Sequence, residues 1–433
     1  MPVFPCIREV SSNAYIRFGT LPSAETTVAL PPSKSIAARQ MMIAAYADAP
    51  LPQYEEDWCD DLRHLHRAIT AVRRGEAVID VGSSGTALRF IATYICMRAH
   101  VKTVLTGSGQ LQRRPIAPLV NALASLGCRV RHAGTDGHAP LEITPGEICG
   151  GEVEVDTSES SQYLSSLLLA APWTRHGLHI RCTGTAVSTP YSQMTLQMLR
   201  AAGAETSTAS RDITVSPGRL TPDKRPPESD WSAASYMYET VALHPPGTLR
   251  IRMEGLRRPQ DTLQGDNAIA SIYRQLGVKT TYDDSGATIE KTTWGGTGHF
   301  DIYMGDIIDL VPAVAATLCG CRKSFRLYGI AHLRHKESDR LASVSAMLRS
   351  LGHAVTAAGD TLESGHYSPP ETPATVDAAG DHRIAMAAAP LAIFSPMNIR
   401  DAACVDKSFP GYFDRLAQLG YDITLTNIQT DTP

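Results

Sequence analysis

Apolar residues along the chain recur in one pattern, in which a helix-like run is followed by a glycine and then by a short strand-like run. The pattern predicts helices that end at five glycines spaced by about 70 residues: Gly127, Gly203, Gly277, Gly352 and Gly420. Glycine suits the left-handed backbone conformation that ends many helices. A weaker copy over residues 69–81 brings the number of predicted α/β units to six.

The predicted units fall into two groups of three. A chain of 433 residues exceeds the roughly 250–300 residues that a single core supports. A stretch rich in proline and charge, residues 221–228, is typical of a domain crossing. We therefore expect two similar lobes of three units each, divided near residue 230, with substrates bound in a cleft between them.

Net charge, cysteine content and the lack of a long apolar run limit the kinds of partner that we expect for this protein. The net charge of −4 gives no general attraction to nucleic acid or acidic lipid, so any anion must be bound by a local cluster of cations. Nine scattered cysteines without a CxxC pair favour free thiols in a reducing compartment. We find neither a signal-peptide pattern nor an apolar run of the roughly 20 residues that a membrane span needs. We expect a cytoplasmic monomer without nucleic-acid or membrane partners.

The densest charge cluster lies in residues 332–341, where three cations and two carboxylates stand within seven residues. A helix is predicted directly afterwards, with Ser338 or Asp339 as its N-cap. Arg340 then lies in the first turn, where the helix dipole disfavours a cation by a few tenths of a kcal/mol. A basic residue fits there if it faces a bound anion. A solvated, salt-bridged helix start is the alternative interpretation of this stretch alone.

Other predicted helices open in the same way, with hydroxyl residues or glycine followed by a cation or a polar side chain. These starts are residues 31–39, 81–89, 112–116, 160–162, 188–191 and 380–383. Seven cations stand at element ends: Lys34, Arg39, Arg114, Lys336, Arg340, Arg383 and Lys407. Brought together, they would hold two or more phosphate or carboxylate groups, and Asp309 and Glu337 would be candidates for acid/base work among them. No metal-binding or nucleotide-binding motif is present.

Taken together and in order, these motifs resemble those of the 5-enolpyruvylshikimate-3-phosphate synthase family over nearly the whole chain. They are Pro32-Ser-Lys34-Ser35, Ser84-Gly85-Thr86-Ala87, Arg113-Arg114-Pro115, Ser160-Ser161-Gln162, Ser188-Thr-Pro-Tyr191, Leu263-Gln-Gly-Asp266, Asp309-Leu-Val-Pro312, residues 333–340, Asp381-His-Arg383 and Lys407-Ser-Phe-Pro410.

The resemblance implies a fold class as well as a domain organisation. The fold is an inside-out α/β barrel of the enolpyruvyl transferase type, with six βαβαββ repeats, three per lobe, and helices surrounded by sheet. One lobe would be discontinuous, residues 1–32 plus 230–433, and would carry the phosphoenolpyruvate and acid/base residues. The other, residues 33–229, would mainly bind shikimate 3-phosphate.

The implied reaction joins shikimate 3-phosphate and phosphoenolpyruvate by addition of the 5-hydroxyl and elimination of phosphate, with no metal or redox cofactor. By resemblance, Asp309 deprotonates the hydroxyl, Glu337 protonates C3, and Lys34 and Lys336 assist. The phosphoenolpyruvate ligands are Lys34, Gly85, Arg114, Gln162, Arg340, Arg383 and Lys407. The shikimate 3-phosphate ligands are Lys34, Ser35, Arg39, Ser160, Ser161, Gln162, Ser188, Tyr191, Asp309, His332 and Lys336.

The chain departs from the family pattern at several positions. Ser83 and Ser84 stand where Asn, Gly or Ala is usual, Phe90 replaces a common Pro, and His332 replaces an Asn. These changes bear on the affinity for phosphoenolpyruvate and on whether glyphosate binds. Two alternatives stay open: a UDP-N-acetylglucosamine enolpyruvyl transferase, which shares the fold, and an inactive binding homologue.

Overall fold

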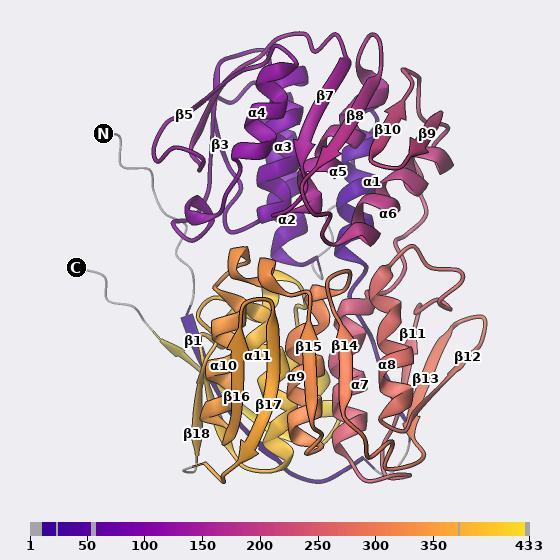
Figure 1. The fold of residues 1–433 in the computed structure, drawn as a ribbon, viewed down its shortest axis with the longest axis vertical. Helices are drawn as coiled ribbons and strands as arrows, with labels where there is room; N and C mark the ends of the chain where they lie inside the picture. The colour runs from indigo at the N-terminus through magenta and orange to yellow at the C-terminus, as the bar shows by residue number, and fades with distance from the viewer. Residues whose placement is uncertain (1–10, 23–24, 53–57, 371–372, 429–433) are drawn as a thin grey trace. The chain divides into compact units, whose positions relative to one another are not determined.

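The computed structural model describes residues 11–22, 25–52, 58–370 and 373–428. Contacts between residues divide this part of the chain into two compact units, which we call unit 1 and unit 2 (Figure 1). Unit 1 comprises residues 34–227, and unit 2 comprises residues 11–33 together with 228–428. Each unit is described by itself.

Unit 1 contains two four-stranded sheets that are built in the same way. The first arises from β3 (Val78–Asp80), α3 (Gly85–Arg98), β4 (Thr103–Thr106), α4 (Ala117–Ser125), β5 (Arg129–His132) and β6 (Leu141–Thr144). The second arises from β7 (Gly151–Asp156), α5 (Ser161–Ala170), β8 (Leu178–Thr183), α6 (Thr189–Ala201), β9 (Thr206–Ala209) and β10 (Asp212–Val215). In both sheets the spatial order of the strands is first, second, fourth, third, and only the first two strands are parallel.

Unit 2 contains three sheets of the same topology. One is formed by β2 (Thr26–Val28), α7 (Trp231–Leu243), β11 (Arg250–Glu254), α8 (Ile269–Gln275), β12 (Val278–Tyr282) and β13 (Gly286–Lys291). The next is formed by β14 (Phe300–Tyr303), α9 (Val311–Gly320), β15 (Phe325–Tyr328), α10 (Arg340–Ser350), β16 (His353–Ala358) and β17 (Thr361–Tyr367). The last is formed by β18 (Ala374–Asp377), α11 (His382–Ala388), β19 (Met397–Arg400), α12 (Tyr412–Gln418) and β20 (Tyr421–Ile428), together with β1 (Ser11–Phe18).

The connectivity explains why unit 2 is discontinuous. Strand β1 occupies the position that the sixth element holds in the other repeats, between β19 and β20. Unit 1 is inserted between β2 and α7, which belong to one repeat. Residues 34–75 contribute α1 (Lys34–Tyr46) and α2 (Asp60–Arg73), a helix pair that has no named strand of its own in the described part of unit 1.

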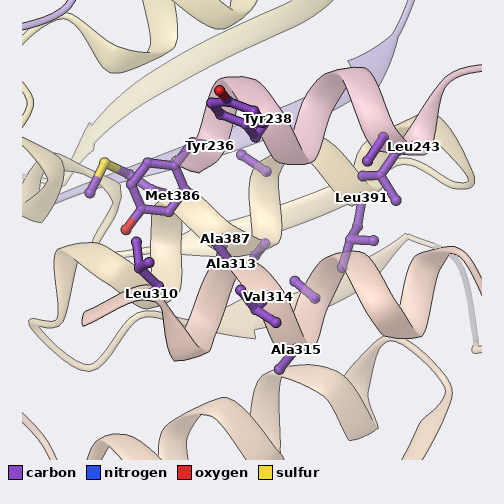
Figure 2. Close-up of a cluster of buried hydrophobic side chains, with 14 of the residues drawn as sticks. Tyr236, Tyr238, Leu243, Leu310, Ala313, Val314, Ala315, Met386, Ala387 and Leu391 are labelled. Carbon is purple, nitrogen blue, oxygen red and sulfur yellow. The ribbon is translucent and has the colours of Figure 1, made fainter. Parts of the chain in front are cut away.

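The first helix of each repeat in unit 2 lies inside the unit. Helices α7, α9 and α11 contact one another and are buried on nearly all sides (Figure 2). A helix that is apolar all round belongs in a core, and alanines such as Ala313 and Ala387 let the backbones approach closely. In unit 1, α1, α3 and α5 contact one another in the corresponding way. The predicted inside-out α/β fold class is confirmed.

The five predicted helix-ending glycines all have a positive φ, between 85° and 104°. Each stands between the second helix of a repeat and the strand that follows it, as the apolar pattern predicted. Gly75, in the weaker copy, has φ +73° but leads into β3, the opening strand of the next repeat. In the described ranges no helix is both long enough and apolar enough to cross a bilayer.

Glu239 is the one charged-type side chain of α7 and is fully buried in unit 2. Neither of its carboxylate oxygens has a hydrogen-bond partner among the described residues. Burial therefore raises the pKa of Glu239 well above its ordinary 4.5, because the charged form loses its hydration. The carboxyl group is a neutral acid in the folded protein and ionises on unfolding.

This difference predicts a pH-dependent stability. When burial raises the pKa of a carboxyl group, the neutral group contributes its full stability at a pH below the pKa of the unfolded state. This contribution is lost as the pH rises from that value toward the pKa of the folded state. Replacing Glu239 by Gln removes the titration, so the stability of Glu239→Gln relative to wild type should rise by up to about 1.4 kcal/mol per pH unit above pH 5. Urea unfolding at pH 5, 6 and 7 measures this; a difference that stays constant with pH would contradict a neutral Glu239.

Candidate active site

Each inner helix of unit 2 starts at an aspartate. Asp230 caps α7 by accepting a hydrogen bond from Ala233 N at 2.9 Å. Asp381 caps α11 by accepting one from Arg383 N at 3.1 Å. Asp309 lies in the short 3-10 turn η4 (Ile308–Leu310) that leads into α9. Because the first two strands of a repeat are parallel, both of its helices start at the same edge of the sheet.

Arg340, the first residue of α10, lies among these helix starts and is 1% exposed. Its guanidinium donates to Asp381 from Nε at 2.8 Å and from Nη2 at 3.1 Å, and to Asp309 from Nη1 at 3.0 Å. Nη2 also donates to Glu337. Burial alone would lower the pKa of Arg340, but these three carboxylates outweigh it and raise the pKa.

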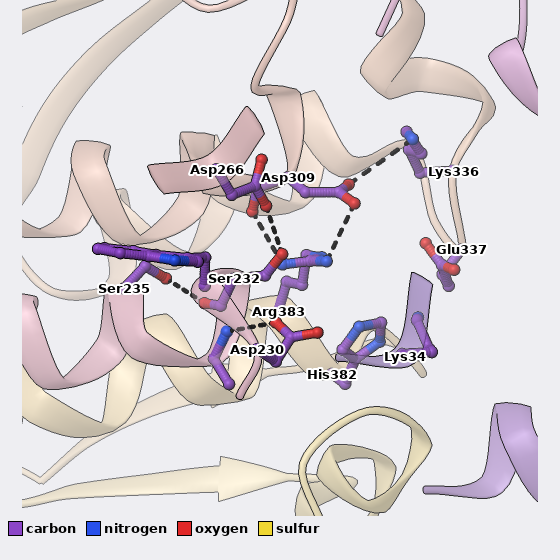
Figure 3. Close-up of polar contacts among 12 residues, drawn as sticks. Lys34, Asp230, Ser232, Ser235, Asp266, Asp309, Lys336, Glu337, His382 and Arg383 are labelled. Carbon is purple, nitrogen blue, oxygen red and sulfur yellow. Dashed lines mark hydrogen bonds and ion pairs between the residues drawn. The ribbon is translucent and has the colours of Figure 1, made fainter. Parts of the chain in front are cut away.

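Asp309 lies between two further cations (Figure 3). Arg383 donates to it from Nη2 at 3.0 Å, and Lys336 Nζ stands 3.7 Å from Oδ1. Burial would raise the pKa of Asp309, but Arg383, Lys336 and Arg340 together hold it well below its ordinary value. Asp309 is therefore a carboxylate, the form that a general base requires.

Glu337 is held at the other side of Arg340, with Lys407 Nζ 3.6 Å from its Oε1. We call the group formed by these side chains the Arg340 cluster: Asp309, Lys336, Glu337, Arg340, Asp381, Arg383 and Lys407. It contains four cations and three carboxylates. The predicted residues of this part of the chain are thus brought together within unit 2.

His332 lies in η5 (Ala331–His335), the turn that precedes Lys336, and is buried. Burial, with Lys336 adding to it, lowers the pKa of His332 to about 4, although Asp309 acts in the opposite direction. The imidazole is therefore neutral near pH 7. His332 is therefore an uncharged hydrogen-bonding group in the turn next to Lys336 of the Arg340 cluster.

In unit 1 the starts of the inner helices α3 and α5 are capped by hydroxyl groups rather than by carboxylates. Ser84 caps α3 by accepting from Ala87 N at 3.2 Å, and Ser160 caps α5 by accepting from Gln162 N at 3.2 Å. Gln162 Nε2 donates to Thr86 Oγ1 at 2.9 Å, which joins the starts of α5 and α3. Ser161, the next predicted ligand, is buried at the start of α5.

Gly85 has a structural reason to lack a side chain. A Cβ atom at this position would stand 2.3 Å from Arg114 Nη1 and 2.8 Å from Arg89 Nη1. Arg89 is buried and donates to Gly85 O at 3.1 Å and to Pro115 O at 2.7 Å, so it ties the start of α3 to the residue after Arg114. The backbone of Gly85 and the guanidinium of Arg114 are thus held in contact distance of each other.

Arg39 on α1 is 2% exposed and donates to several groups inside unit 1. Its partners are Thr195 Oγ1, Ser165 Oγ, Ser35 O and Tyr191 O, at 2.7 to 3.2 Å. Burial lowers the pKa of Arg39 to about 10, with Tyr191 acting in the opposite direction. Arg39 therefore places Ser35 and Tyr191 relative to each other.

The remaining predicted residues Ser188 and Lys34 stand at the starts of α6 and α1. Ser188, at the start of α6, is buried and has the left-handed φ of +51°, a conformation that is rare outside glycine and often marks a functional position. Lys34, the first residue of α1, pairs with Asp61 of α2 at 2.8 Å.

The comparisons with known proteins bear on what these two sets of residues do. The family model for EPSP synthase (3-phosphoshikimate 1-carboxyvinyltransferase) matches residues 53–416. The chain belongs to the EPSP synthase family.

Curated relatives agree with this assignment. A 3-phosphoshikimate 1-carboxyvinyltransferase from Bacteroides fragilis is 36% identical over 406 residues, which cover 92% of this chain and 96% of the relative. One from Methanosphaerula palustris is 32% identical, covering 90% of this chain and 96% of the relative.

Solved structures support the fold of this EPSP synthase family member. EPSP synthase from Acinetobacter baumannii has a TM-score of 0.72 at 22% identity, covering 96% of this chain and all of that one. The enolpyruvyl transferase NikO from Streptomyces tendae has a TM-score of 0.69 at 14% identity, covering 97% of this chain and all of that one.

Sequence reasoning missed three acidic residues, Asp381 and Asp266 in unit 2 and Asp61 in unit 1. Asp381 stands in a recognised motif, and its position just before a helix is a signal that it caps and binds cations. Asp266 also stands in a motif; it is buried, accepts from Ser232 Oγ, and has a pKa raised to about 7 by burial and by Asp309. Asp61 belongs to no motif, and only the fold reveals its contact with Lys34.

The Arg340 cluster predicts a large stability effect at one position. Arg340→Met leaves Asp381, which is fully buried, without its principal cation, and this should lower the free energy of unfolding by about 3–5 kcal/mol. Arg334→Met is the matched control, because Arg334 pairs with Asp339 at 3.4 Å with 43% of its side chain exposed, and should cost less than about 1 kcal/mol. Urea unfolding compares them; equal losses in the two variants would contradict a structural role for the cluster.

Proposed function

We propose that this protein transfers the enolpyruvyl group of phosphoenolpyruvate to the 5-hydroxyl of shikimate 3-phosphate. The products are 5-enolpyruvylshikimate 3-phosphate and phosphate, a step of aromatic amino acid biosynthesis. One observation carries the proposal: in a member of the EPSP synthase family, Asp309 and Glu337 lie within one cluster of four cations. The reaction needs a base, an acid and fixed positive charge around two anionic substrates.

Unit 2 supplies the acid and the base. Asp309, held as a carboxylate, removes the proton of the 5-hydroxyl as the oxygen adds to C2 of phosphoenolpyruvate. Glu337 delivers a proton to C3. In the tetrahedral intermediate the bond between C2 and the phosphate oxygen then breaks, while C3 returns a proton to the Glu337 carboxylate and the C2=C3 double bond re-forms. The cations that surround the phosphate stabilise the departing charge.

The same cations make the proton transfers depend on substrate binding. Arg340, Arg383 and Lys407 hold phosphoenolpyruvate, so its phosphate and carboxylate compete with Asp309 and Glu337 for positive charge. Glu337 is paired with Arg340 and Lys407, and a substrate anion that shares the charge of these cations loosens both pairs before Glu337 delivers its proton. Lys336, 3.7 Å from Asp309, assists the movement of charge and also binds shikimate 3-phosphate.

Unit 1 supplies most of the remaining ligands. Lys34, Arg114 and the Gly85 backbone bind phosphoenolpyruvate, and Gln162 contacts both substrates. Ser35, Arg39, Ser160, Ser161, Ser188 and Tyr191, together with His332 and Asp309 of unit 2, bind shikimate 3-phosphate. Hydroxyl-capped helix starts support this assignment, because their N–H groups and dipoles favour an anion.

His332 fits the assignment although it departs from the family pattern. An imidazole with a pKa of about 4 is neutral at the pH of the reaction, so it replaces one uncharged hydrogen-bonding group by another. Ser84 likewise keeps a neutral cap at α3. These two departures from the family pattern therefore leave the charge of the site unchanged.

We include in the proposal a cytoplasmic location and a monomeric state without nucleic-acid or membrane partners. Support for the location comes from the cysteines: eight in the described ranges are free thiols, as a reducing compartment favours.

A phosphate-release assay tests the reaction. The protein should release phosphate from phosphoenolpyruvate when shikimate 3-phosphate is the acceptor. It should release none when UDP-N-acetylglucosamine replaces shikimate 3-phosphate. Turnover with the UDP-sugar alone would overturn the choice of acceptor. Binding of shikimate 3-phosphate without phosphate release would mean that the protein is an inactive homologue.

A further inference from the structure

The ion pair between Lys34 and Asp61 joins the starts of two helices of unit 1. Lys34 is the first residue of α1 and Asp61 the second residue of α2. Lys34 Nζ donates to Asp61 Oδ2 at 2.8 Å, and the two side chains are 18% and 5% exposed. A lysine side chain has four rotatable bonds, and holding it in one conformation costs up to about 2 kcal/mol of entropy. A buried carboxylate within hydrogen-bond distance provides that restraint.

The same turn of α2 also supports the loop before Gly85. His64, one turn after Asp61, packs its imidazole where a Cβ of Gly82 would stand, with Cε1 only 2.3 Å from that position. Gly82 has φ +54° and lies in the loop that ends at the Ser84 cap. The first two turns of α2 therefore contact both Lys34 and the backbone that leads to Gly85.

We infer that Asp61 is a positioning residue for the transfer reaction, which acts by fixing the ammonium group of Lys34 and does not itself contact a substrate. The inference rests on the proposed function insofar as Lys34 takes part in the reaction. It adds a residue outside the recognised motifs, on a helix that contributes no predicted ligand. If the pair served only to join α1 to α2, its loss would change stability and leave the properties of Lys34 unaltered.

The test compares Asp61→Asn and Asp61→Glu with Asp60→Asn. Asp60 is the matched control, because it is the preceding residue of α2 and its more exposed side chain pairs with the half-buried Arg63 at 3.6 Å. Asp61→Asn keeps the size of the side chain and removes its charge, and Asp61→Glu restores the charge on a longer side chain. Melting temperatures identify any variant that fails to fold.

Two readouts are used. The rate at which an amine-reactive ester labels Lys34, measured by mass spectrometry of peptides, should rise at least threefold in Asp61→Asn and less in Asp61→Glu. In the phosphate-release assay, kcat of Asp61→Asn should fall at least tenfold while KM for shikimate 3-phosphate changes less than threefold, with partial recovery in Asp61→Glu. Asp60→Asn should match wild type in both.

The labelling readout needs no turnover, so it separates the two proposals. If wild type releases no phosphate, the proposed function fails, and unchanged labelling of Lys34 in Asp61→Asn would still overturn the positioning role. If wild type is active, Asp61→Asn with wild-type kcat would overturn it as well. If Asp61→Asn does not fold, Asp61→Glu takes its place. A wild-type kcat in Asp61→Glu, together with at least threefold faster labelling of Lys34, would overturn the positioning role of Asp61.

Discussion

Burial of Arg340 is the constraint on which the rest of unit 2 depends. Removing a guanidinium from water costs several kcal/mol, and only a complete set of well-placed carboxylates offsets that cost. Asp381, fully buried and capping α11, supplies two of the hydrogen bonds. Asp309 and Glu337 supply the others. The interaction that keeps Arg340 inside the protein therefore also fixes the two groups to which we assign proton transfer.

The two units use the same repeat in different chemical ways. In unit 1 the starts of α3 and α5 are capped by serines, which leave the positive ends of the helix dipoles uncompensated. In unit 2 the corresponding starts carry aspartates, and the positive charge comes instead from Lys336, Arg340, Arg383 and Lys407. This division concentrates positive charge locally in a chain whose net charge is −4, as the proposed binding of two anionic substrates requires.

The sequence predicted the repeated α/β units and the residues that stand at the starts and ends of the helices. Helix-ending glycines such as Gly352 identified the repeats, because a left-handed residue after a helix constrains the amino acid directly. The sequence did not predict contacts between elements that are far apart in the chain. Asp61 has no local signal, since its partner lies on another helix, and Arg39 donates four hydrogen bonds within the protein that no motif reveals. Strand β1 completing the last sheet also depends on tertiary pairing.

In the proposed reaction the Arg340 cluster fixes the position of Glu337, which acts as a proton donor rather than as a binding group. The most direct measurement is a single-turnover experiment on Glu337→Gln, combined with calorimetric affinities for both substrates. The account predicts that the rate of the chemical step falls by about 10²–10⁴-fold while both affinities stay within about threefold of wild type. Substrate affinities weakened by about 10²–10⁴-fold, with an unchanged rate of the chemical step, would contradict the role of Glu337 as proton donor.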